Sequence, residues 1–120
     1  MNTERPTVVC LCGSTRFGEE FAAANLRETL AGKIVLTIGC NMHSDYELFA
    51  HMAPDELDKV KTNLDTLHFR KIELADEVLI LNKDGYIGQS TRNELNHARG
   101  LGKKIRWLES AENLPLPSGV

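Results

Sequence analysis

The stretch TVVCLCGSTR, residues 7–16, decides the fold. Its first six residues form an unbroken run of apolar and β-branched side chains, and Gly13 and Ser14 end that run. A continuous run of this kind is typical of a parallel strand that is buried on both faces. In open parallel sheets, ligands bind beyond the carboxyl ends of the strands. The stretch therefore predicts a central strand with a candidate site directly after it.

The rest of the chain alternates helical and strand patterns. A helix is expected over about residues 17–31, before Gly32, and a second strand over residues 33–39. Pro54, followed by two acidic residues, starts a long amphipathic helix, and a third strand is expected over residues 77–82. A last helix is expected over about residues 90–101, and a last strand over residues 104–108. This β-α-β order predicts one α/β domain, residues 1–120, with a parallel sheet.

Composition excludes several partners. The formal net charge is −3, and acidic and basic residues are interleaved without a basic run, so extended nucleic acid is not an expected partner. No apolar segment has the length of a membrane helix, and the N-terminal residues lack the apolar core of a signal peptide, so we expect no membrane contact and a cytoplasmic location. Residues 40–53 are a candidate lid, and the tail 114–119 is too rich in proline and glycine for a helix or strand.

The three cysteines do not predict a disulfide or a metal site. Cys10 and Cys12 lie two residues apart and would share one face of the first strand, while Cys40 stands alone. This arrangement lacks the paired spacing of a zinc site. We therefore expect buried thiols, and no metal or other cofactor.

The first strand leads into a candidate phosphate loop. Gly13 allows a close approach of the backbone, and Ser14, Thr15 and Arg16 offer two hydroxyls, amide groups and a guanidinium at a helix N-terminus. All of these favour a bound phosphate. The alternative is a helix start that Ser14 or Thr15 caps, with Arg16 in solvent.

A second set of candidates precedes and begins the last helix. Glu94 stands four residues before Ala98 and seven before Leu101, which places it on or beside the stripe that faces the sheet. A carboxylate there is costly unless it is used or paired. The alternative is a capping box with Thr91 as N-cap and Glu94 at N3. His68, on the long helix, is either a packed histidine bonded to a backbone carbonyl or a catalytic group.

Three blocks of sequence resemble the nucleoside 2-deoxyribosyltransferase superfamily, which includes nucleotide N-glycoside hydrolases. They are LCGSTR at residues 11–16, IELADEVLIL at residues 72–81 and GQSTRNELNHA at residues 88–98. The resemblance implies a flavodoxin-like or Rossmann-like three-layer sandwich with a parallel sheet of four to five strands, usually as a homodimer or larger assembly. It also implies cleavage or exchange of an N-glycosidic bond.

The resemblance assigns roles to particular residues. The nucleophilic glutamate falls on Glu94, and the phosphate loop falls on Gly13, Ser14 and Arg16. We thus expect cleavage of a nucleoside 5'-monophosphate by Glu94, with Gly13, Ser14, Thr15 and Arg16 on the phosphate, Ser90 and Thr91 assisting on phosphate or sugar, and His68 as a candidate acid or base.

The chain departs from the family pattern in ways that favour a hydrolase over a transferase. Gly88 stands where transferases usually carry aspartate, Cys10 replaces a common aromatic residue, and His68 takes the place of a frequent aspartate. Two alternatives stay open. One is a non-catalytic nucleotide-binding or sensing module of the same fold, and the other is an NAD-cleaving enzyme.

Overall fold

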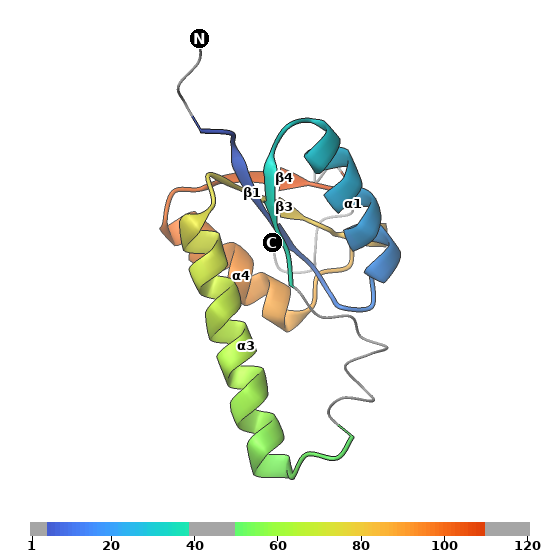
Figure 1. Cartoon of the computed structure of the whole chain (residues 1–120), viewed down its shortest axis with the longest axis vertical. Coiled ribbons are helices and arrows are strands. Elements are labelled where there is room, and N and C mark those ends of the chain that lie inside the picture. Colours follow the sequence, from blue (N-terminus) through green and yellow to red (C-terminus); the bar gives the residue numbers. More distant parts are fainter. Residues whose placement is uncertain (1–4, 39–49, 110–120) are drawn as a thin grey trace, which may run out of the picture.

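The computed structural model describes residues 5–38 and 50–109 (Figure 1). Most of the candidate lid, residues 40–49, and the whole of the tail 114–119 lie outside the described residues. Within the described part of the chain, no helix is both long and apolar enough to cross a membrane.

A four-stranded parallel sheet forms the centre of the described structure. Its strands are β1 (Val8–Cys12), β2 (Ile34–Leu36), β3 (Glu77–Ile80) and β4 (Lys104–Trp107). They lie in the order β2-β1-β3-β4, and every neighbouring pair is parallel. The predicted α/β class is confirmed. The strands are shorter than predicted, most clearly β2, which keeps three of seven residues.

Helices cover both faces of the sheet. Helix α1 (Gly18–Leu30) covers one face, and α3 (Pro54–Leu74) and α4 (Gln89–Gly100) cover the other (Figure 1). A single 3-10 turn, Lys83–Gly85, follows β3. The result is a three-layer sandwich of the flavodoxin or Rossmann type.

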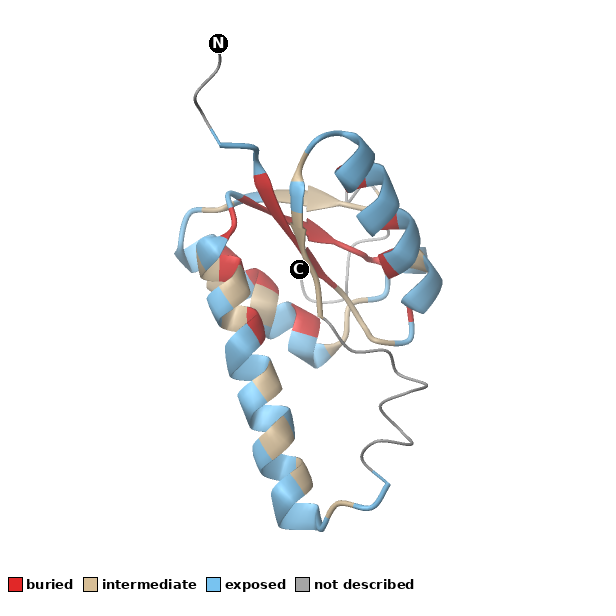
Figure 2. Ribbon diagram, viewed as in Figure 1, coloured by how far each residue is buried: buried red, intermediate tan, exposed pale blue. Residues whose placement is uncertain are grey.

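The central strand β1 divides the core into two halves, because successive side chains of a strand point to opposite faces. Cys10 and Cys12 pack with Ile72 and Ala98 on the side of α3 and α4, whereas Val9 and Leu11 pack with Phe21 on the side of α1. All five β1 residues are buried, as Figure 2 shows in red.

A cluster of charged side chains is buried on the α1 side of the sheet. Glu28, near the end of α1, is only 3% exposed and bonds to Arg106, and Lys33 Nζ lies 3.3 Å from Glu28 Oε1. Glu77, at the start of β3, bonds to the same two cations, each at 2.9 Å. The two carboxylates are thus held side by side by cations that they share.

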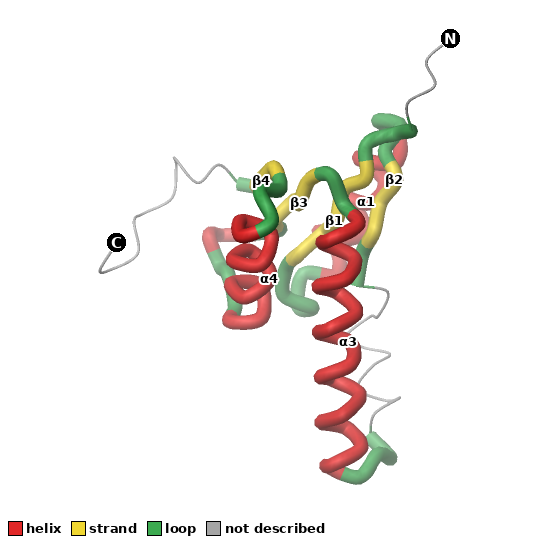
Figure 3. The backbone as a smooth tube through the Cα atoms, turned by 90° about the vertical axis from the view of Figure 1, so that its left-hand side faces the viewer, coloured by secondary structure: helices red, strands yellow, loops and turns green. Residues whose placement is uncertain are grey.

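Helix α3 is much longer than the strands that it covers. Its two buried residues, His68 and Ile72, both lie in its second half. The first half extends past the carboxyl end of the sheet and is exposed or partly exposed along its length (Figures 2 and 3). This projecting half stands as a wall beside the strand ends.

A candidate active site at the strand ends

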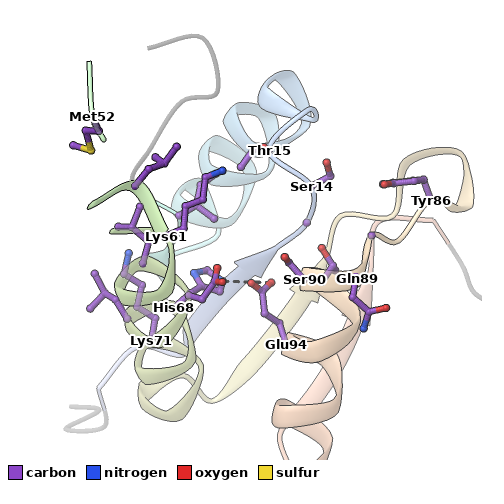
Figure 4. Close-up of a pocket in the computed structure, with 18 of the residues that line it drawn as sticks. Ser14, Thr15, Met52, Lys61, His68, Lys71, Tyr86, Gln89, Ser90 and Glu94 are labelled. Carbon is purple, nitrogen blue, oxygen red and sulfur yellow. Dashed lines mark ion pairs between the residues drawn. The ribbon is translucent and has the colours of Figure 1, made fainter. Parts of the chain in front are cut away.

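A pocket of about 950 Å³ lies at the carboxyl ends of the strands (Figure 4). Its floor comes from the loop after β1 and from the first turns of α4, and α3 forms one wall. Seven of the predicted site residues line it, namely Gly13, Ser14, Thr15, His68, Ser90, Thr91 and Glu94. The fold therefore brings together groups that lie up to 81 positions apart in the chain, because parallel strands end at the same edge of the sheet.

The loop after β1 forms a tight turn into α1. The amide of Phe17 donates to the carbonyl of Ser14 at 3.0 Å, and the amide of Arg16 donates to Ser14 Oγ at 3.3 Å. The N-cap of α1 is Phe17, which makes no side-chain cap bond. Neither Ser14 nor Thr15 is thus the N-cap residue of α1; the Ser14 hydroxyl accepts from the loop amide of Arg16, and both residues line the pocket.

Gly13 has a packing role that the sequence did not indicate. A Cβ atom at this position would lie 3.0 Å from Leu81 Cβ and 3.3 Å from the Leu81 carbonyl oxygen. Because Gly13 has no side chain, the backbone of this loop can lie against Leu81, directly after β3. This contact sets the loop directly beside the segment that leads to α4.

Arg16 is the predicted site residue that does not line the pocket. Its guanidinium lies over the ring of Tyr86, 4.2 Å from the centroid, and Nη2 donates to Tyr86 Oη at 3.2 Å. Tyr86 itself does line the pocket. The cation therefore stands at the rim, held by a cation–π contact.

Glu94 projects from the second turn of α4 toward α3 (Figure 4). The helix begins at Gln89 after the N-cap Gly88, so Thr91 is its third residue and is buried at 2% exposure. The capping box of Thr91 and Glu94 is therefore wrong. Leu101 is also 46% exposed rather than on the inward stripe, because α4 ends at Gly100 and leaves Leu95 and Ala98 against the sheet.

His68 lies between Glu94 and two thiols. Its Nε2 atom is 3.9 Å from Glu94 Oε1, 3.4 Å from Cys12 Sγ and 3.7 Å from Cys10 Sγ. The imidazole is 5% exposed, as a packed histidine should be, but the contacts found here for Nε2 are thiols and a carboxylate rather than a backbone carbonyl.

Burial, hydrogen bonds and neighbouring charges together shift the pKa values of Glu94, His68 and the two cysteines. Loss of hydration raises the pKa of Glu94 to about 7, although the positive field of His68 acts in the opposite direction. The hydrogen bond between the two cysteines lowers the pKa of Cys10 and raises that of Cys12. Burial opposes charge on His68, but its contact with Cys10 and the nearby Glu94 carboxylate bring the pKa of the imidazole above its usual value.

Sequence reasoning missed several polar groups on the α3 wall. Lys61, Asp65 and Lys71 line the pocket with His68. Together with His68 they follow one another at spacings of four, three and three residues, which puts all four on one face of a helix. This spacing was the signal in the sequence that could have identified them. Lys71 Nζ also donates to the Thr37 carbonyl at 2.7 Å, which ties the wall to the end of β2.

Comparisons of the chain with protein-family models, with curated proteins and with solved structures gave no match.

Proposed function

We propose that the protein is a nucleotide N-glycosidase that cleaves a nucleoside 5'-monophosphate. The observation that carries this proposal is that Glu94 and the loop residues Gly13, Ser14 and Thr15 open into one pocket. A single ligand can thus meet a buried carboxylate and a phosphate-binding type of loop at the same time. The pocket volume of about 950 Å³ is at the upper end of the range for small-molecule sites.

The reaction uses Glu94 as the nucleophile. Its ionised carboxylate attacks C1' of the sugar while the bond from C1' to the base nitrogen breaks through an oxocarbenium-like state. The electron pair of that bond leaves with the base, which takes up a proton, and water then hydrolyses the glycosyl ester and restores the carboxylate. The positive field of His68 at 3.9 Å favours the ionised form of Glu94.

The other predicted residues act by binding. Ser14, Thr15, Ser90 and Thr91 offer hydroxyl groups on two sides of the pocket, and the N-terminus of α4 adds its positive dipole. A phosphate held by these groups fixes the position of C1' relative to Glu94. Arg16 stands at the rim on Tyr86, from which its long side chain can turn toward a bound phosphate.

The test is release of free base from a panel of nucleoside 5'-monophosphates, followed by chromatography. We expect release with at least one member, and a loss on the order of 1000-fold or more in Glu94→Gln, because a missing nucleophile is not replaced by its neighbours. Glu56→Gln is the matched control, since Glu56 is exposed at the start of α3 and should leave the rate unchanged.

Two results would contradict the proposal. One is the absence of release from every nucleotide, and the other is equal rates in the wild type and Glu94→Gln. Thermal stabilisation by a nucleotide without any release would instead favour the non-catalytic binding module. The homodimer implied by the family resemblance stays a prediction, which sedimentation of the purified chain would test.

A further inference from the structure

Two thiols and one imidazole converge behind Glu94. Cys10 and Cys12 come from β1, and His68 comes from α3 on the other side of the gap between sheet and helix. Their donor atoms all lie within 4.8 Å of one another, and both cysteines are 0% exposed. Across residues 5–38 and 50–109, this is the one group of at least three such side chains with that geometry.

The two nitrogen–sulfur distances match those of a tetrahedral zinc site. Zinc binds a thiolate sulfur at about 2.3 Å and an imidazole nitrogen at about 2.0 to 2.1 Å, so a tetrahedral angle puts sulfur and nitrogen roughly 3.6 Å apart. The two distances from His68 Nε2 are 3.4 Å to Cys12 Sγ and 3.7 Å to Cys10 Sγ. The two sulfur atoms also lie within 4.8 Å of each other, so an ion bound to the imidazole is within reach of both thiols.

We propose that Cys10, Cys12 and His68 bind a zinc ion, with its fourth position open toward the pocket. Glu94 Oε1 is 3.9 Å from His68 Nε2, but Glu94 is not among the three side chains whose donor atoms all lie within 4.8 Å of one another. Its carboxylate therefore stays outside the donor set and remains available to the reaction proposed above. A site with two thiolates and an imidazole binds zinc in preference to magnesium or calcium, which prefer oxygen ligands.

The scaffold holds the two thiols at a fixed separation. Cys10 and Cys12 alternate with Leu11 on the central strand, so both face α3, and β1 is paired on both sides. His68 and Glu94 line the pocket, which gives the ion a route from solvent. A site of this kind needs both a rigid frame and an entry path.

A zinc ion displaces the protons of both thiols, and its two positive charges balance the two thiolates that form. The alternative is that the thiols and the imidazole only pack together, and it predicts no affinity for metal beyond that of surface histidines.

The experiment measures metal binding alone, so its result does not depend on whether the protein cleaves nucleotides. The full chain, reduced and freed of metal with a chelator, is titrated with Co²⁺ and then with Zn²⁺. We expect one equivalent of Co²⁺ to give a thiolate-to-cobalt charge-transfer band and the visible bands of a tetrahedral complex, both of which Zn²⁺ removes by displacement.

Substitutions of the ligands identify the site. Cys10→Ser, Cys12→Ser and His68→Gln should each weaken binding by more than the 10- to 100-fold that loss of an outer-shell partner causes. Glu94→Gln should keep the charge-transfer band, because both thiolates remain. Circular dichroism without metal shows which variants keep the fold, and at least one cysteine variant with intact helices is needed for the comparison.

Matched controls come from a cysteine and a histidine that are not among the proposed ligands. Cys40→Ser and His97→Gln should bind Co²⁺ as the wild type does; His97 lies on α4 and contacts Glu73 instead. The proposal is overturned if the wild type gives no thiolate band, if folded Cys10→Ser and Cys12→Ser variants both keep full affinity, or if Cys40→Ser removes the band.

Discussion

Replacing Glu28 with glutamine tests the buried charged cluster on the α1 side of the sheet. Glutamine keeps the volume of the side chain but removes the negative charge that faces Arg106 and Lys33. Contact with these cations, Arg106 first, lowers the pKa of Glu28 from 4.5 to about 2, against the effect of burial. By linkage, a shift of this size corresponds to at most about 3 kcal/mol of folding free energy.

Exposure of the two cations to solvent makes the contribution of Glu28 to stability smaller than this upper limit. The side chains of Lys33 and Arg106 are 24% and 30% exposed, so water and salt screen part of the attraction. We therefore expect Glu28→Gln to lower the free energy of unfolding by about 1 to 3 kcal/mol at neutral pH. Glu77 remains as a partner for both cations, which limits the loss.

The loss of stability in Glu28→Gln should depend on pH in a definite direction. A carboxyl group whose pKa is lower in the folded state stabilises the fold above its unfolded pKa, and this stabilisation disappears as the pH falls through the folded pKa. The difference between wild type and Glu28→Gln should thus be full above about pH 4.5 and shrink steadily toward about pH 2.

Urea denaturation at neutral pH and at about pH 3 measures both quantities. Glu19→Gln, in the exposed first turn of α1, is the control and should change stability little. A loss of the same size at both pH values, or no loss at neutral pH, would refute the electrostatic explanation of the cluster.

Two further predictions concern the loop after β1. Gly13→Ala should lower the free energy of unfolding by about 1 to 3 kcal/mol in urea, because its Cβ would press on Leu81, whereas Gly18→Ala has open space and should not destabilise the fold. Arg16→Ala should raise KM for a nucleoside 5'-monophosphate by about 10- to 100-fold, the value of a charge-assisted contact, and leave KM for the matching unphosphorylated nucleoside unchanged. Arg92→Ala, exposed on α4, is the control; an equal rise for both substrates would show that Arg16 does not contact the phosphate.

The layered fold was predictable because the apolar runs of its two central strands end at clear positions in the sequence. The run before Gly13 and the run before Asn82 became β1 and β3, and their carboxyl ends lie together for a topological reason that needs no side-chain detail. The juxtaposition of the Gly13 loop with Glu94 follows from that topology. The chain order of helices and strands was therefore enough to place the pocket.

Other features depended on contacts that one-dimensional spacing does not show. The direction of Arg16 is set by the ring of Tyr86, 70 residues away. The alternative with Thr91 as N-cap was wrong because α4 begins at Gln89, two residues earlier, after the N-cap Gly88. The group formed by His68 and the two cysteines needs the rotation of α3 about its axis over the sheet, which depends on packing of residues such as Ile72.

The projecting half of α3 gives the pocket a wall whose stability differs from that of its floor. Helical turns with few buried side chains open in local fluctuations at a lower free energy than the central strands, which open only when the whole domain unfolds. Amide hydrogen exchange should thus be fastest at the start of α3, slower near His68 and slowest in β1. The width of the pocket mouth would then vary through fraying of one helix end, while the β1 loop and Glu94 keep their relative positions.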